Sequence, residues 1–261
     1  MKAKKHLGQN FLKSKVIVER IAASAGVVET DNVLEIGPGK GILTEALLKK
    51  AGKVFVVEKD PELIPSLCDK FKEELKNKKL VLIEGDILET DMQKLIKGPY
   101  KVVANIPYYI TGEIMRAFLS SNHKPESMTL LVQKEVAKRI VANDKKESIL
   151  SLSVKIFGEP RITEIVKRTM FTPAPNVDSA VIHISNISNQ KLKGAGIEES
   201  RFFEIVKVGF AQKRKQLLGN LKSRNKGNLL EKFLSENNLP LTIRAEDIPV
   251  ETWIKIVKIL S

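Results

Sequence analysis

A glycine-rich turn follows the first apolar run of the sequence, where Glu35 and Ile36 lead into Gly37-Pro38-Gly39-Lys40-Gly41. Glycines between a strand and a helix let the backbone approach a ligand closely at the carboxyl edge of a parallel sheet. The dinucleotide fingerprint G-x-G-x-x-G would require glycine at position 42, where this chain has Ile42. The third glycine comes one residue earlier, so the spacing argues against a nicotinamide site. From this motif alone, a simple tight turn stays an alternative.

Two carboxylates follow the next two predicted strands. Glu58 lies twenty-one residues after Gly37, and Asp86 follows Gly85. A carboxylate at the end of the second strand can accept hydrogen bonds from both hydroxyls of a ribose, each contributing roughly 1.5–3 kcal/mol. Asp86 is placed to accept a hydrogen bond from an adenine amine. With Gly37 and Gly39, these acids predict a site for S-adenosyl-L-methionine, because G-x-G-x-G preceded by an acid is typical of class I methyltransferases.

The fourth predicted strand ends in a second motif, Asn105-Ile106-Pro107-Tyr108. An adenine amine is a poor nucleophile because its lone pair is delocalised into the ring, so its methylation needs acceptors that hold the amine. We expect the Asn105 side-chain oxygen and the Ile106 main-chain carbonyl to be those acceptors, and Asn105 also to be one of the cofactor-binding residues. Tyr108 offers a face for a flipped base, which stacking would stabilise by roughly 1–3 kcal/mol. Read alone, the motif is better explained as a turn after a strand, where Asn and Pro are common.

This chemistry requires neither a metal ion nor a covalent nucleophile, because a sulfonium donor already carries its leaving group and positioning suffices. The single cysteine, Cys68, is predicted to pack within a helix. Together with only three scattered histidines, it makes a structural zinc site unexpected.

Short β-branched runs alternate with helical stretches in the first two thirds of the chain. This alternation predicts an α/β fold with a parallel sheet that helices cover on both faces. A polar stretch over 185–200 is predicted to be a linker. We therefore expect a Rossmann-like catalytic domain over 1–188 and a small all-α domain over 189–261, with helices at Phe202–Leu221, Gly227–Asn237 and Val250–Leu260. The predicted strands are Asn32–Ile36, Lys53–Val57, Leu80–Ile83, Lys101–Ala104, Ser127–Val132, Ser151–Phe157 and Val177–Ile184.

The net charge of +13 indicates a polyanionic partner, although a solvated basic surface is the plain alternative. Basic residues cluster at Lys2-Ala3-Lys4-Lys5-His6 and again at Lys213-Arg214-Lys215, with Lys222, Arg224 and Lys226 beyond. The sequence has no apolar run long enough to cross a bilayer and no apolar signal core at its start. We expect a cytoplasmic protein without a membrane partner.

Taken together, these motifs resemble the ribosomal RNA small-subunit adenine N6-dimethyltransferase family over nearly the whole chain. Further segments that are similar to the family are Leu7–Leu12, Val132–Ala137, Phe171–Ala180, and Phe210–Lys215 with Leu221. The resemblance implies that Asn10 and Leu12 contact the cofactor, that Phe171 helps to clamp the target base, and that Lys213, Arg214 and Lys215 contact the RNA backbone. One departure is Gly112-Glu113, where a small residue and a proline are expected, so the shape of the target pocket is open.

The same resemblance implies the reaction and the substrate. Two methyl groups would be transferred to each of two adjacent adenosines near the 3′ end of 16S rRNA in the 30S particle, by a monomer that releases S-adenosyl-L-homocysteine and takes part in small-subunit biogenesis. The nearest alternative is an erythromycin-resistance methylase acting on 23S rRNA. A non-catalytic ribosome-assembly factor is the alternative from another class, but it would be expected to lose the acceptor residues that this chain retains.

Overall fold

The computed structural model describes residues 4, 8–142 and 144–261, which form two compact units. The sheet unit comprises Met1–Ala137 and Glu159–Ile187, and the helical unit comprises Lys138–Gly158 and Ser188–Ser261. Residues 138–158 thus belong with the C-terminal helices, although they precede position 188 in the sequence. The basic run Lys2–His6 lies, apart from Lys4, outside the described residues.

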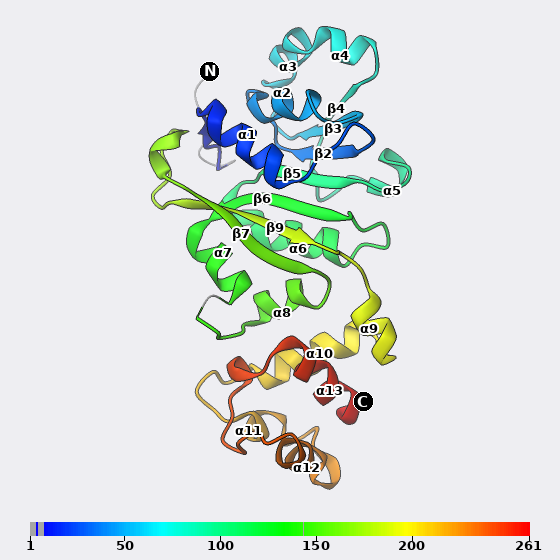
Figure 1. Cartoon of the computed structure of the whole chain (residues 1–261), viewed down its shortest axis with the longest axis vertical. Coiled ribbons are helices and arrows are strands. Elements are labelled where there is room, and N and C mark those ends of the chain that lie inside the picture. Colours follow the sequence, from blue (N-terminus) through cyan, green and yellow to red (C-terminus); the bar gives the residue numbers. More distant parts are fainter. Residues whose placement is uncertain (1–3, 5–7, 143) are drawn as a thin grey trace. The chain divides into compact units, whose positions relative to one another are not determined.

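The sheet unit is built on a seven-stranded sheet in the order β4-β3-β2-β5-β6-β9-β7 (Figure 1). The first five strands in this order run parallel, whereas β9 pairs antiparallel with both β6 and β7. The prediction of a parallel sheet is therefore wrong at this edge, because β7 and β9 form a hairpin-like pair rather than a β-α-β crossover. The strands are β2 (Asn32–Ile36), β3 (Lys53–Glu58), β4 (Leu80–Glu84), β5 (Lys101–Asn105), β6 (Ser127–Gln133), β7 (Glu159–Val166) and β9 (Ser179–Ser185).

Helices cover both faces of the sheet, and its central strands are therefore buried on both faces. One core cluster joins α1 and α2 with alternate residues of β2, β3 and β5, among them Val33, Val54 and Val103. The chain order reverses between β2 and β5, so right-handed crossovers place α6 on the opposite face from α2. The helices of this unit are α1 (Lys15–Ser24), α2 (Ile42–Leu48), α3 (Ile64–Lys70), α4 (Lys72–Lys76), α5 (Met92–Leu95), α6 (Thr111–Leu119) and the beginning of α7 (Lys134–Val141), with short 3-10 turns η2 (Tyr108–Ile110) and η3 (Arg168–Met170).

A separate two-stranded sheet pairs β1 (Phe11–Leu12) with β8 (Phe171–Thr172). In its antiparallel register Leu12 lies opposite Phe171. Two segments that are far apart in the sequence thus meet beside the main sheet. No local pattern predicts these strands, because each is only two residues long.

The helical unit contains α8 (Ile149–Lys155), α9 (Gln190–Ala195), α10 (Glu199–Gly209), α11 (Leu217–Leu221), the 3-10 turns η4 (Lys226–Asn228) and η5 (Ala245–Asp247), α12 (Leu229–Glu236) and α13 (Val250–Leu260). The predicted strand Ser151–Phe157 is wrong, since Ser148 caps a helix there and the adjacent Glu159–Val166 forms the strand instead. The predicted linker over 185–200 holds α9 and the beginning of α10. The predicted helix Phe202–Leu221 is two helices.

The end of α10, before the break that separates it from α11, packs closely against Trp253. A Cβ atom on Gly209 would lie 2.4 Å from the ring of Trp253, so only glycine allows the end of α10 to approach the buried indole this closely. Asn220 then donates a hydrogen bond from Nδ2 to the Gly209 carbonyl at 2.6 Å. The chain turns through 210–216 before α11 begins.

None of the helices in the part of the chain that the structure describes is both long and apolar enough to cross a membrane. Cys68 lies on α3 as predicted, but its side chain is exposed, so its predicted packing role is wrong.

Candidate active site

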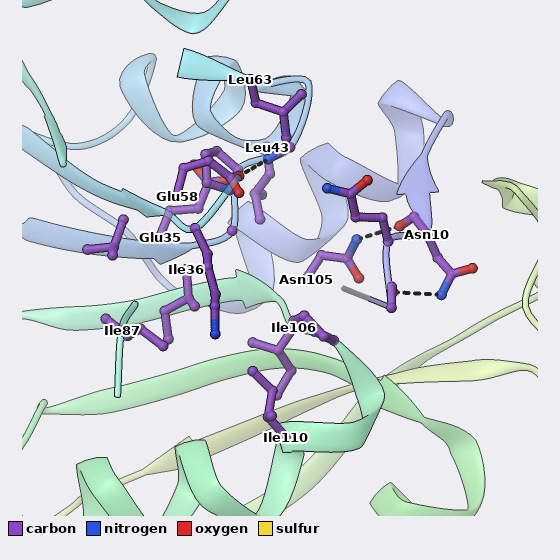
Figure 2. A pocket seen from close by; sticks show the side chains of 18 of the residues that line it. Asn10, Glu35, Ile36, Leu43, Glu58, Leu63, Ile87, Asn105, Ile106 and Ile110 are labelled. Carbon is purple, nitrogen blue, oxygen red and sulfur yellow. Dashed lines mark hydrogen bonds between the residues drawn. The ribbon is translucent and has the colours of Figure 1, made fainter. Parts of the chain in front are cut away.

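A cavity of about 370 Å³ opens at the carboxyl edge of the parallel strands in the sheet unit. It lies where the strand order reverses between β2 and β5, the position at which open α/β sheets bind ligands. Figure 2 shows Glu35 and Glu58 on one side of it and Asn10 and Asn105 on the other. Nine of the predicted site residues line it: Asn10, Leu12, Gly37, Gly39, Glu58, Asp86, Asn105, Ile106 and Tyr108.

The glycine turn after β2 forms the floor of this cavity. Gly37, Gly39 and Gly41 all have positive φ angles, of 62°, 58° and 69°, which other residues rarely adopt. A Cβ atom on Gly39 would lie 2.9 Å from the ring of Phe11, whereas one on Gly37 would meet no atom within 4 Å. Gly37 and Gly39 are therefore both required for the backbone shape of the turn. The backbone of Gly37 also has open space beside it.

Glu58, at the end of β3, is buried and held by the backbone. One carboxylate oxygen accepts a hydrogen bond from the Gly39 N–H at 3.1 Å, and the other accepts one from the Asp60 N–H at 2.8 Å. Burial raises the pKa of Glu58 above its ordinary value, although these hydrogen bonds oppose the shift. The carboxylate lines the cavity with its orientation fixed and its remaining lone pairs available to a hydroxyl donor.

Glu35 also lines the cavity, although the sequence motif assigns it no role beyond preceding the glycine turn. The residue is only 1% exposed, and burial raises its pKa to about 8. The buried oxygen Oε2 has no hydrogen-bond partner among the described residues. Glu35 is therefore largely protonated at neutral pH, and it presents an unsatisfied polar group beside the space where a ligand would lie.

Asp86, after β4, is engaged by a lysine at the edge of the cavity. Lys59 Nζ lies 2.6 Å from one Asp86 oxygen, and the Leu88 N–H donates to the other at 3.0 Å. The hydrogen bond from Lys59 lowers the pKa of Asp86, so the carboxylate is ionised. An adenine amine would have to share this acceptor with Lys59.

On the opposite side, Asn105 donates a hydrogen bond from Nδ2 to the main-chain oxygen of Asn10 at 3.1 Å. In Figure 2 the amide nitrogen of Asn105 points toward Asn10 and the oxygen points away from it. The bond therefore leaves Oδ1 as the atom of this side chain that can accept a hydrogen bond. The Asn10 side chain itself turns to the Gly8 carbonyl at 3.1 Å, so Asn10 contributes to this side through its backbone.

Tyr108 begins the 3-10 turn η2, directly after Asn105-Ile106-Pro107. Its hydroxyl lies 2.6 Å from Oγ of Ser179, at the beginning of β9. Burial raises the pKa of Tyr108, so the phenol is protonated at neutral pH. Sequence reasoning included Ser179 only in a family-like segment and did not connect it to Tyr108, since the two residues are 71 positions apart.

The segment that carries Asn10 is fastened at Asp60, which is buried after β3. Gln9 Nε2 donates to one Asp60 oxygen at 2.7 Å, and Lys4 Nζ lies 2.7 Å from the other. Burial opposes ionisation of Asp60, but the bonds from Lys4 and Gln9 lower its pKa. Nothing in the local sequence indicates this contact.

The remaining predicted site residues lie elsewhere. Phe171 is 1% exposed, belongs to the hydrophobic core and is not among the residues that line the cavity. Its role as a clamp of the target base stays a prediction. Lys213, Arg214 and Lys215 lie in the exposed turn between α10 and α11 of the helical unit rather than on a helix.

The unexpected pair Gly112-Glu113 lies in the first turn of α6. Glu113 is exposed and lines the cavity together with Tyr109 and Ile110, which sequence reasoning missed. A proline is favourable in the first turn of a helix, but α6 forms there without one. Among the described residues no group of three or more His, Cys, Asp or Glu side chains could hold a metal ion.

Known proteins are similar to this chain over its whole length. The family model for ribosomal RNA adenine dimethylase matches residues 1–261. A ribosomal RNA small subunit methyltransferase A from Dehalococcoides mccartyi is 41% identical over 98% of this chain and 88% of its own length. One of the same name from Fusobacterium nucleatum is 38% identical over 100% of this chain and 98% of its own length.

Two solved structures share the architecture. The crystal structure of the 23S rRNA methyltransferase ErmE covers 96% of this chain and 99% of its own, with a TM-score of 0.81 and 27% identity. A dimethyladenosine transferase from Plasmodium falciparum covers 94% of this chain and 95% of its own, with a TM-score of 0.78 and 25% identity. The fold is thus that of Rossmann-like methyltransferases, as the sequence predicts. On the family match and on the identity to these relatives, the chain belongs to the ribosomal RNA adenine dimethylase family, whose enzymes use a methyl donor of the S-adenosylmethionine type.

Proposed function

We propose that the protein transfers methyl groups from S-adenosyl-L-methionine to the exocyclic amines of two adjacent adenosines near the 3′ end of 16S rRNA, within the 30S particle. The observation that carries this proposal is the orientation of Asn105. Its amide N–H is bound to Asn10 O, which leaves the oxygen as the atom that can accept a hydrogen bond on a side chain that lines the cavity.

The cavity residues fit an adenosine-containing cation. Glu58 offers carboxylate lone pairs whose direction two backbone N–H groups fix, and the largely protonated Glu35 lies beside it in the cavity wall. The open space over Gly37 allows close approach of a ligand to the backbone. When bound, the cofactor supplies an electrophilic methyl group on a sulfonium. Gly37, Gly39, Glu58 and Asp86 would hold it, with Asn10 and Leu12 covering it.

The protein's own contribution is to hold and polarise the target amine. Asn105 Oδ1 and the Ile106 carbonyl would accept the two N–H bonds of that amine, which localises its lone pair on nitrogen. Tyr108 would stack against the flipped base, and the burial of its surroundings would exclude water from the reacting atoms. Methyl transfer leaves the amine cationic, and it loses one proton to solvent as the base leaves the pocket. A second transfer requires that the pocket readmit the monomethylated amine.

The partner and the cellular setting follow from the same proposal. The exposed turn with Lys213, Arg214 and Lys215 would bind the phosphate backbone of rRNA, consistent with the net charge of +13. The enzyme would act as a monomer in the cytoplasm during small-subunit biogenesis.

Tritiated methyl transfer to 30S subunits from a strain without this activity tests the proposal, with nucleoside analysis of the product. We expect N6,N6-dimethyladenosine in 16S rRNA. Protein-free 23S rRNA is the matched substrate for the alternative, a 23S adenine methylase of the kind that the ErmE structure represents. Methylation of 23S rRNA alone would reject the 16S assignment, and no transfer to either RNA would reject the enzymatic one.

A further inference from the structure

We propose that Ser179 is a positioning residue whose hydrogen bond to Tyr108 fixes the angle at which the Tyr108 ring meets the target adenine. The inference rests on the proposed function, because it assigns Tyr108 the stacking role. It concerns a residue that lies outside the cavity wall and acts through another side chain.

The contact is direct and shielded from water. The Tyr108 hydroxyl and Ser179 Oγ are 2.6 Å apart, and Ser179 is 0% exposed. Within the described part of the chain, Tyr108 is the one hydrogen-bond partner of Ser179 Oγ. Without this partner, the phenol hydroxyl could bond to water in several ring orientations. A single buried partner favours one orientation of the ring.

Ser179 itself is held on both sides. As the first residue of β9, it lies opposite Gln133 of β6 and opposite Val166 of β7. The preceding residue, Asp178, accepts a hydrogen bond from Lys134 N–H at 3.0 Å and, through its carboxylate, one from Arg168 N–H at 3.0 Å. The antiparallel edge of the sheet therefore provides a fixed anchor.

The turn that carries Tyr108 is closed by bonds to its main chain rather than to its ring. The η2 turn is three residues long. Its backbone is closed by the bond from Thr111 Oγ1 to the Tyr108 carbonyl at 3.0 Å. That bond fixes the main chain at Tyr108 but not the side-chain torsions. Within the described part of the chain, the contact with Ser179 is the one hydrogen bond that holds the far end of the ring.

The test is a double-mutant cycle of Ser179→Ala and Tyr108→Phe, assayed on 30S subunits from a strain that lacks the activity. Each single variant should lower kcat about five- to tenfold, the size expected for one lost hydrogen bond. The double variant should lose no more than either single one, because both changes remove the same bond. The cofactor dissociation constant, measured by calorimetry, should stay within about twofold of wild type, since the proposed function places Tyr108 against the target base and not against the cofactor.

Thr129→Val is the matched control, because it removes another fully buried hydroxyl from the same sheet, one that bonds His183 at 2.8 Å and does not line the cavity. It should change the melting temperature but not kcat. An equal loss of kcat in Thr129→Val, additive losses in the cycle, or wild-type kcat in Tyr108→Phe would each overturn the inference. If Ser179→Ala does not fold, the kcat of Tyr108→Phe alone tests the inference, since this variant removes the same hydrogen bond and retains the ring. Failure of the proposed function would appear instead as absence of transfer by the wild-type enzyme.

Discussion

The two sides of the cavity are held in different ways. On the acidic side, Glu58 is fixed by backbone N–H groups only 19 and 2 residues away in the sequence. On the amide side, Asn105 is bound by a residue 95 positions away and Tyr108 by one 71 positions away. The first side is built by a strand and the turn beside it, and the second by contacts across the whole sheet unit.

This difference implies a division of labour. The acidic side depends on local structure that forms with the parallel strands, so it should bind cofactor even when distant contacts are disturbed. The amide side depends on β9 and on the segment that leads into β1, so its geometry should be more sensitive to distant substitutions. Changes on the two sides should accordingly separate cofactor binding from methyl transfer.

The largest effect should come from Asn105→Ala, on the amide side. It removes one of the two proposed acceptors for the target amine, and loss of one preorganised group in the transition state lowers kcat by ~10²-fold or more. Single-turnover transfer of tritiated methyl groups to 30S subunits measures this loss. Cofactor affinity, measured by calorimetry on the same variant, should stay near the wild-type value. A variant with wild-type turnover would contradict the acceptor role.

Glu58→Ala tests the acidic side and should have the opposite signature. Loss of a carboxylate that binds ribose hydroxyls weakens cofactor binding by roughly 1.5–3 kcal/mol, or about 10- to 150-fold in the dissociation constant. At saturating cofactor, kcat should be largely retained. Glu84→Ala is a matched control, since Glu84 lies opposite Glu58 on β4 but is exposed and outside the cavity wall. Equal affinity in both variants would refute the ribose role.

The same division explains what the sequence predicts well. The glycine turn, Glu58, Asp86 and Asn105 each lie at the end of a parallel strand, and parallel strands bring their carboxyl ends to one edge, so their meeting follows from local patterns alone. The five parallel strands β2 to β6 are each predicted within one residue of their observed ends. These strands are short, apolar runs with clear boundaries.

The failures concern contacts that only the tertiary structure creates. Ser151–Phe157 has β-branched residues and reads as a strand, yet the capping box at Ser148 and burial of Leu152 and Val154 make it a helix. The β1–β8 pair, the Gln9–Asp60 bond and the Tyr108–Ser179 bond leave no periodic signal in the sequence. Phe171 shows a further limit, because a resemblance implies its role but not its burial beside Leu12.

The basic turn in the helical unit provides a change that should affect neither side of the cavity. Replacing Lys213, Arg214 and Lys215 by Ala should weaken rRNA binding roughly tenfold at moderate salt and lower the salt slope of log K by about 0.7 for each phosphate that the variant no longer neutralises. Filter binding over a salt series measures both. A control variant with Lys72, Lys76 and Lys78 replaced removes equal charge from exposed positions of the sheet unit. If the two variants have the same salt slope, the effect is one of net charge and the turn has no specific role.

The smallest effect should appear in the pH dependence of stability, and it again separates the two sides. Burial raises the pKa of Glu35 to about 8 in the folded chain, above its ordinary value of 4.5, so the folded state holds this proton more tightly than the unfolded state. Stability therefore falls as pH rises from about 4.5 to about 8, and the Glu35 contribution between pH 7 and pH 8 is about 1 kcal/mol. Urea unfolding of the ligand-free protein at these two pH values should show this loss for wild type and a smaller one for Glu35→Gln. Asn105→Ala should keep the wild-type difference, because the amide has no proton to lose. Parallel pH profiles for wild type and Glu35→Gln would mean that Glu35 is already ionised at neutral pH, and the acidic side would then hold two negative charges before any cationic ligand binds.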